Sequence, residues 1–165
     1  MDAIGPSSSS SSTHMWKYHV FLSFRGEDTR NNFTNHLYAA LNQKGIYTFR
    51  DDEKLERGKR ISPVLLKAIE DSLFAIVVLS KNYASSTWCL GNLWRSWNAK
   101  KKMGQIVLPI FYDADPFEVR KQTGTYAQVF KEHEKRFKEN IDKVHKWRAI
   151  LTDVSNLSGW SLEGR

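Results

Sequence analysis

The sequence of 165 residues lacks long apolar runs and is poor in cysteine, with Cys89 as its one cysteine. A single cysteine cannot form a disulfide within the chain, which excludes a disulfide-stapled secreted fold and favours a reducing environment. No stretch reaches the roughly 18 consecutive apolar residues that a transmembrane helix needs. We therefore expect a cytoplasmic or nuclear protein with no membrane partner.

Several motifs of nucleotide-binding and metal-binding proteins are also missing. The sequence has no Walker-type phosphate loop and no glycine-rich dinucleotide fingerprint, and its five histidines have no metal-ligand spacing. A two-component receiver would carry clustered acids after the first strand and an aspartate after the third. The corresponding segments here end in Ser23-Phe24-Arg25 and Leu79-Ser80-Lys81. We expect no metal ion and no tightly bound cofactor.

The composition allows one folded domain, because 41% of the residues are hydrophobic and the chain is short for two cores. Residues 1–15 contain an unbroken serine run and predict a disordered tail. Residues 158–165 contain Gly159 and Gly164 and predict the start of a linker. The predicted domain therefore covers residues 16–157, within what we expect to be a longer protein.

The net charge of +7 permits an acidic partner such as nucleic acid. The densest basic cluster is Lys100–Lys102 with neighbouring Arg95, and no base-stacking or groove-entering motif accompanies it. Cations are favourable at a helix C-terminus, which is the simpler explanation for this cluster. We expect no nucleic-acid partner.

Apolar segments of two kinds alternate along the chain. Residues 74–79 and 106–112 are continuous apolar runs, typical of strands that are buried on both faces. Other segments carry apolar residues at helical spacing. The resulting order, βαβαβαβαα, predicts an open, mostly parallel sheet flanked by helices, with ligands at the carboxyl ends of its strands. Predicted strands cover 18–24, 46–49, 74–79 and 106–112, and predicted helices cover 33–44, a segment from 62 onward, 126–137 and 142–157.

Local signals suggest where some of these elements begin. Asp28 and Thr29 follow the first strand and are expected to cap a helix. Ser62 with Pro63 predicts the start of the next helix. A loop containing Gly124 is expected before the helix that begins near residue 126.

Short segments in a fixed order carry a resemblance to a known family. They are VFLSFRGEDTR at 20–30, FRDD at 49–52, SKNYA at 80–84, WCL at 88–90, VLPIFY at 107–112, DP at 115–116, VR at 119–120, QTG at 122–124 and KWR at 146–148. Their order and spacing closely resemble the plant Toll/interleukin-1 receptor (TIR) domain of intracellular nucleotide-binding leucine-rich-repeat immune receptors. The resemblance implies a flavodoxin-like three-layer sandwich with a five-stranded parallel sheet flanked by helices.

The resemblance also implies an activity and a site. The family hydrolyses NAD+ (or NADP+) at the nicotinamide ribosyl bond, in some members with cyclisation. It places Arg25 and Gly26 in the nucleotide pocket, and Ser86 and Trp88 at the edge of the helix that carries the catalytic glutamate. An arginine can hold a pyrophosphate through paired hydrogen bonds, and an aromatic face suits an adenine or nicotinamide ring.

Each assignment has a plainer structural alternative. Without the resemblance, Arg25 would be expected to form a surface ion pair with Glu27 or Asp28, and Trp88 to pack in the core. In the family, the BB loop at residues 51–60 gates the pocket, whereas alternating charges alone predict a solvated loop. The loop residues that we assign to this role are Asp51, Asp52, Glu53, Leu55, Arg57 and Gly58.

The family signals through self-association, so other TIR domains are the expected partners. One family surface involves the first and last helices, where Asn35-His36 stands in place of a frequent Ser-His pair. The other surface lies around Gly124 and the fourth helix. The alternative for both surfaces is an exposed polar face with no partner.

The chain departs from the family at the catalytic position. The family has Trp-Cys-Leu-x-Glu-Leu, whereas residues 88–93 here are WCLGNL, with Asn92 in place of the glutamate. Glycosidic cleavage passes through an oxocarbenium-like state that a carboxylate stabilises, and Asn92 has neither charge nor basicity. We therefore expect little or no NAD+ hydrolysis. Two alternatives stay open: an active enzyme, if residue 92 is truly glutamate or a neighbouring acid substitutes, and a non-enzymatic scaffold or decoy.

Residues 91–99 differ from the family as a block. One possible coding string, GGG AAC TTG TGG AGA TCC TGG AAT GCA, gives Glu-Leu-Val-Glu-Ile-Leu-Glu-Cys when it is read from its third base, and the family places that sequence here. Two compensating small indels would explain the block, and a diverged non-enzymatic relative is the alternative. As given, Trp94 and Trp97 stand where valine and leucine would pack, so we expect an overpacking cost of ~1–3 kcal/mol each and a displaced or loosened helix.

The indel hypothesis predicts a paired insertion and deletion in independent genomic and transcript sequences between Leu90 and Lys102. Sequences that keep one unbroken frame through these codons contradict it.

Overall fold

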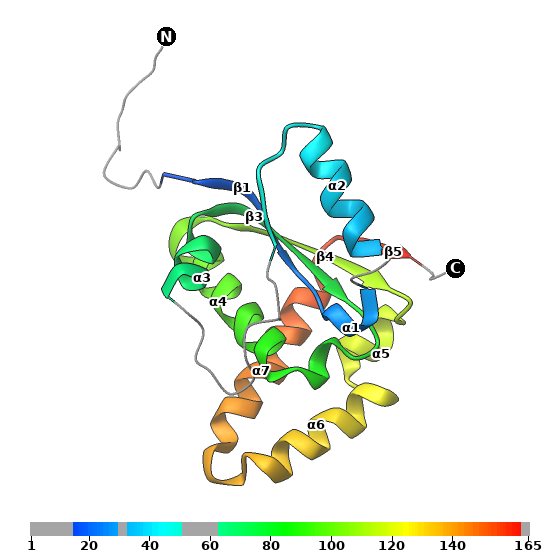
Figure 1. Cartoon of the computed structure of the whole chain (residues 1–165). Helices are drawn as coiled ribbons and strands as arrows, with labels where there is room; N and C mark the ends of the chain where they lie inside the picture. Colours follow the sequence, from blue (N-terminus) through cyan, green and yellow to red (C-terminus); the bar gives the residue numbers. More distant parts are fainter. Residues whose placement is uncertain (1–14, 30–32, 51–62, 163–165) are drawn as a thin grey trace.

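The computed structural model of the chain describes residues 15–29, 33–50 and 63–162, and these form a five-stranded sheet (Figure 1). All its strand pairs are parallel, in the order β2-β1-β3-β4-β5. The chain leaves β1 on one side to form β2 and continues on the other side with β3, so the topological switch point lies between β1 and β3. The strands are β1 Tyr18–Ser23, β2 Thr48–Arg50, β3 Ser72–Leu79, β4 Ile106–Tyr112 and β5 Trp160–Leu162.

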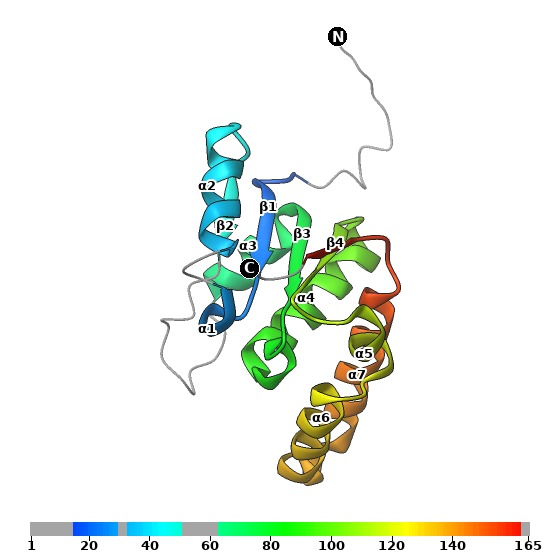
Figure 2. The same cartoon turned by 90° about the vertical axis from the view of Figure 1, so that its right-hand side faces the viewer.

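Helices cover both faces of the sheet, which confirms the predicted α/β architecture. In Figure 2, α2 lies on one side of the strands, and α4 and α7 lie on the other side. The helices among the described residues are α1 Gly26–Thr29, α2 Asn35–Gln43, α3 Pro63–Glu70, α4 Thr87–Met103, α5 Pro116–Lys121, α6 Thr125–Arg136 and α7 Ile141–Ser155, with short 3-10 turns η3 Tyr83–Ser85 and η4 Lys138–Asn140.

The central strand β3 shows why the apolar run predicted burial on both faces. Ala75, Val77 and Leu79 join the core cluster that also contains residues of α4 and α7. Val78 and Ile76 belong to the opposite cluster, against which residues of α2 pack. Every second residue points to the same face, so a strand covered on both faces needs apolar side chains throughout.

The face on the α2 side is covered less completely by the described residues. None of residues 35–43, which form α2, is buried. Toward the β5 edge, Ile106, Trp160 and Leu162 are 42%, 59% and 38% exposed. Trp160 pairs with Ile110 and Leu162 with Tyr112, so these side chains share the face of Ile106.

The predicted boundary between domain and linker at residue 158 is wrong, because β5 belongs to the sheet. Trp160 to Leu162 pair with β4, and the backbone N–H of Asp113 donates to the carbonyl of Leu162 at 2.6 Å. A side chain at Gly159 would collide with the carbonyl of Pro109, so glycine lets the chain cross β4 closely. Backbone pairing rather than an apolar pattern holds this short strand.

A helix also occurs where a loop was expected, between β4 and the helix near residue 126. The Asp115 carboxylate accepts a hydrogen bond from the Phe117 N–H at 2.9 Å, and Pro116 occupies the first turn of α5. Both features are standard helix-start signals. The turn ends at Gln122, whose φ of 57° is left-handed.

The expectation of a loosened helix after Trp88 is also wrong, because α4 is continuous and ends at Gly104 in a left-handed cap. Trp94 and Trp97 lie half-buried at the rim of the core rather than inside it. The Arg95 guanidinium lies 5.1 Å from the Trp94 ring centre, and the Lys100 ammonium 5.9 Å from that of Trp97. The aliphatic stems of such side chains can cover the outer faces of the rings.

The misfit in α4 falls instead at Ser96. This side chain is fully buried, and its Oγ makes no hydrogen bond within the described part of the chain. A buried hydroxyl without a partner costs about 1–3 kcal/mol. The alternative coding frame places isoleucine here, which suits a fully buried position.

We predict that Ser96→Ala stabilises the protein by about 1 kcal/mol, because it removes the desolvation penalty and leaves only a small void. Urea unfolding of this variant, beside the exposed-site control Ser158→Ala, measures the change. A clear loss of stability in Ser96→Ala alone would contradict the assignment.

Candidate functional site

Polar side chains meet at the carboxyl ends of β1 and β3, on both sides of the switch point. Parallel α/β sheets bind their ligands at this position. The loop after β1 carries Arg25 and leads into α1, and the connection after β3 runs from Ser80 to Ser86 and leads into α4. These two segments are adjacent because β1 and β3 pair in register as far as Ser23 with Val77.

Asp28 bridges the two segments. Its Oδ2 accepts from the Ser80 hydroxyl at 2.5 Å and from the Asn82 backbone N–H at 2.9 Å, and its Oδ1 accepts from the Asn82 side-chain amide at 3.1 Å. The expectation that Asp28 caps the following helix is therefore wrong, whereas the same expectation for Thr29 concerns residues 30–32, which lie outside the described residues. Thr34 stands at the N-cap of α2, and Asp28 bonds to a segment more than 50 residues away in the sequence.

A second set of hydrogen bonds joins the end of β1 to the start of α4. The Tyr83 hydroxyl donates to the Cys89 carbonyl at 3.1 Å, so the 2.8 Å contact with Ser23 uses the Ser23 hydroxyl as donor. The Cys89 thiol donates to the Phe24 carbonyl at 3.4 Å. All these atoms are buried, so the first turn of α4 is fixed against β1.

The residues assigned to the nucleotide pocket lie on these two segments. Arg25 is half-buried, and its carbonyl accepts the N–H groups of Asp28 at 3.0 Å and Thr29 at 3.3 Å, which closes the single turn of α1. Gly26, also buried, begins that turn. Ser86 is the N-cap of α4, where its hydroxyl accepts the Cys89 N–H at 3.1 Å.

Trp88 and Asn92 share a face of α4, because they are four residues apart. Trp88 is half-buried and packs against the cluster of Phe21, Leu65 and Ile69, so the core-packing alternative describes part of its surroundings. Asn92 lies one turn further along and is 1% exposed. The helix therefore holds a buried, uncharged amide at the position that the resemblance assigns to a catalytic carboxylate.

No neighbouring acid on α4 can replace that carboxylate, because residues 87–103 contain no aspartate or glutamate. Asp28 is engaged by Ser80 and Asn82. Asp71 lies at the opposite edge of the sheet, where its carbonyl accepts the Tyr18 N–H at the start of β1. Its carboxylate forms an ion pair with Lys67 at 3.4 Å.

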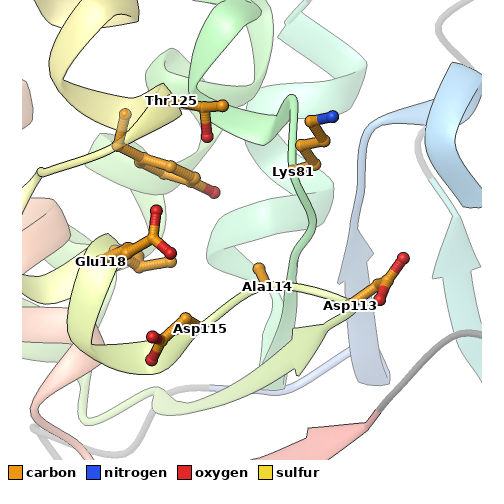
Figure 3. Close-up of a pocket in the computed structure, with 8 residues that line it drawn as sticks. Lys81, Asp113, Ala114, Asp115, Glu118 and Thr125 are labelled. Atoms are coloured by element: carbon orange, nitrogen blue, oxygen red, sulfur yellow. The ribbon is translucent and has the colours of Figure 1, made fainter.

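An adjacent cavity of about 200 Å³ lies beyond the ends of β3 and β4 (Figure 3). Lys81 lines it on the β3 side, and Asp115 and Glu118 line it on the α5 side. None of the described residues assigned to the nucleotide pocket is among its lining residues. The sequence-based site and this cavity are therefore distinct.

Two of the residues assigned to self-association, Asn35 and Gly124, have structural roles within the chain itself. The Asn35 side-chain oxygen accepts from the Arg50 guanidinium at 2.7 Å, and Arg50 also lies 4.3 Å from the Tyr38 ring centre. His36 is exposed. Gly124 has φ 60°, a backbone conformation that residues with a side chain rarely adopt, so glycine is favoured there, and a side chain would also displace the flexible Glu118 carboxylate.

The first and last predicted helices do not form one surface in the described structure. They correspond to α2 and α7, which lie on opposite faces of the sheet (Figure 2). The BB-loop residues Asp51, Asp52, Glu53, Leu55, Arg57 and Gly58 lie outside the described residues.

Two kinds of feature are absent from the described residues. They contain no group of three or more histidine, cysteine or acidic side chains placed to hold a metal ion. Among them, no helix combines the length and the apolar character needed to cross a lipid bilayer.

Sequence reasoning missed three residues of this constellation: Asp28 as a bridge, and Ser23 with Tyr83 as the link to α4. Ser23 and Asp28 lie inside the first segment of the resemblance, and Tyr83 inside the third. The segments themselves were the available signal, whereas their contacts across the sheet follow only from the fold.

A parallel sheet with helices on both faces and bridged polar loops at its switch point defines a doubly wound α/β domain. The family model described as TIR domain matches residues 17–164, so the chain belongs to the TIR domain family. This confirms both the predicted family and the predicted fold.

The chain is similar to domains of plant disease-resistance proteins. It is 53% identical to TMV resistance protein N of Nicotiana glutinosa over 151 residues, which cover 92% of the chain and 13% of that protein. It is 53% identical to disease resistance protein RPV1 of Vitis rotundifolia, covering 94% and 11%, and 46% identical to RPS6 of Arabidopsis thaliana, covering 94% and 14%. The chain thus spans about an eighth of the length of these relatives.

A solved structure agrees with this placement. The TIR domains in the activated Roq1 resistosome directly recognizing the pathogen effector XopQ superpose with a TM-score of 0.82 at 55% identity, covering 88% of this chain and 87% of that one.

Tyr126 supports the β3–α4 connection and makes stability sensitive to alkaline pH. Its hydroxyl donates to the Ser80 carbonyl at 2.5 Å. Burial, and then the nearby Asp28 and Cys89, raise the pKa of this phenol far above its ordinary value of 10.0. The folded state therefore keeps the proton that the unfolded state loses, and this stabilisation is complete below pH 10 and lost as the pH rises above it.

We predict that Tyr126→Phe is less stable than the parent by about 1 kcal/mol near pH 8, because a hydrogen bond is lost. Above pH 10 its stability should fall less steeply than that of the parent. Urea unfolding between pH 8 and pH 11, with the exposed-site variant Tyr47→Phe as control, measures both effects. Parallel stability curves for parent and Tyr126→Phe would contradict the assigned environment.

Proposed function

We propose that the chain is a self-associating signalling domain whose site binds NAD+ and hydrolyses it slowly or not at all. Membership of the TIR family and the similarity to plant disease-resistance proteins support the signalling role. The similarity to TIR domains within the Roq1 resistosome supports assembly with other TIR domains. The observation that carries the catalytic part is Asn92, buried one turn beyond Trp88.

The two segments at the switch point offer groups suited to a dinucleotide. Arg25 supplies a permanent cation for the pyrophosphate, and Gly26 allows the backbone of α1 to approach it. Trp88 supplies an aromatic surface for a ring, and the rest of its side chain packs on the core, which fixes its orientation. We assign these residues and Ser86 to nucleotide binding.

Catalysis requires a group that residue 92 does not supply. Cleavage of the nicotinamide ribosyl bond builds positive charge on the ribose, which a carboxylate stabilises by charge or by covalent capture. An amide at residue 92 does neither, and losing such a residue costs about 10²–10⁴-fold or more in rate. The residues assigned to nucleotide binding are still present, so we expect the chain to bind NAD+ even though it does not hydrolyse it.

We predict that the chain as given releases nicotinamide from NAD+ at background rate and that Asn92→Glu raises the rate at least about 100-fold. The matched control is Asn98→Glu, which adds the same charge to the same helix at a half-buried position. Chromatographic quantification of nicotinamide, with circular dichroism to verify folding, provides the measurement.

Two results would overturn this account. Release by the unaltered chain at the rate of the glutamate variant would show that another group supplies the chemistry. A folded Asn92→Glu variant that binds NAD+ without cleaving it would favour a scaffold or decoy that never needed the reaction.

A further inference from the structure

Asp28 stands out because its hydrogen bonds span the switch point rather than stabilise its own helix. Its three donors among the described residues all belong to the β3–α4 connection: the Ser80 hydroxyl, the Asn82 backbone N–H and the Asn82 side-chain amide. Ser80 is buried, and hydrogen bonds to an ionised carboxylate are stronger than those between neutral groups.

We propose that Asp28 is a positioning residue of the nucleotide site. It sets the spacing between the loop that carries Arg25 and Gly26 and the connection that ends at Ser86 and leads to Trp88. It does so without touching the nucleotide. This inference rests on the proposed binding of NAD+ between those segments.

The direction of its hydrogen bonds argues against direct contact with the ligand. Both carboxylate oxygens accept donors from the chain's own β3–α4 connection. A carboxylate that touched the pyrophosphate would place like charges together, which is unfavourable. Asp28 therefore acts on the site through Ser80 and Asn82.

The same connection is held from its other side by α6. The Tyr126 hydroxyl donates to the Ser80 carbonyl at 2.5 Å, and the His133 Nε2 lies 2.7 Å from the Ala84 carbonyl. Without Asp28, the connection stays attached to α6, and to the end of β1 through Ser23 and Tyr83, but its Ser80 end loses the hydrogen bonds that join it to the loop after β1. Removal of Asp28 should therefore weaken ligand binding more than it weakens the fold.

The first experiment measures NAD+ affinity and the thermal midpoint for the full chain, Asp28→Ala and Asp28→Asn, with Asp153→Ala as an exposed aspartate control. We expect Asp28→Ala to weaken binding about tenfold or more, since small misplacements of binding groups have large effects. Asp28→Asn keeps an oxygen acceptor and should recover part of the affinity. Unchanged affinity in a folded Asp28→Ala variant overturns the proposal.

The second experiment separates positioning from contact. The same Asp28→Ala change is made in a background that carries Ser80→Ala and Asn82→Ala, which removes two of the three donors. If Asp28 is a positioning residue, Asp28→Ala should lower NAD+ affinity much less in that background than in the parent. A loss as large as in the parent shows direct contact and overturns the proposal.

A third readout keeps this inference distinguishable from the proposed function. If the parent chain itself binds no NAD+, the proposed function fails. The positioning role is then tested by recording, without ligand, the NMR resonances of the Trp88 indole and of the Arg25 and Ser86 amides. These should shift in Asp28→Ala and stay in place in Asp153→Ala. Unshifted resonances overturn the positioning role as well.

Discussion

The structure depends most on how the carboxyl ends of β1 and β3 are held together. Strands of a parallel sheet end in loops whose polar groups lose water as the loops pack, so those groups need partners from the neighbouring loop. Asp28 supplies them on the solvent side through Ser80 and Asn82, and Ser23 and Tyr83 supply them in the interior. These bonds position the start of α4, and with it the helix that carries Trp88 and Asn92.

That framework is intact although the helix it positions has an unusual sequence. Buried positions on α4 include residues 93, 96 and 99, where the chain has leucine, serine and alanine and the alternative coding frame has leucine, isoleucine and cysteine. The exposure pattern thus suits the alternative frame better at residue 96. The bulky indoles of Trp94 and Trp97 are tolerated because they lie at the rim of the core, where their faces meet Arg95 and Lys100. The fold tolerates this block of changes, and the proposed loss of chemistry rests on residue 92.

Local and long-range features differed in how well the sequence predicted them. The predicted bounds of β4 match the structure, because an unbroken apolar run is itself the signature of a strand covered on both faces. The three-residue strand β5 could not be predicted from the hydrophobic pattern of the sequence, because backbone pairing with β4 holds it while the Trp160 side chain stays exposed. The role of Asp28 was equally hidden: a helix cap is a local signal, whereas its actual partners are more than 50 residues away and become neighbours only through the sheet. Ser96 shows the converse, a polar residue whose burial only the structure reveals.

The central proposal is that the chain binds NAD+ and that Asn92 does not perform the reaction that a carboxylate would. Proton NMR of NAD+ mixed with the unaltered chain and followed over hours tests it most directly, because the same spectra report binding by saturation transfer and cleavage by the resonances of released nicotinamide. We predict saturable transfer to intact NAD+, with nicotinamide resonances no stronger than in a protein-free sample. Accumulating nicotinamide, or the absence of saturable transfer, would contradict the claim.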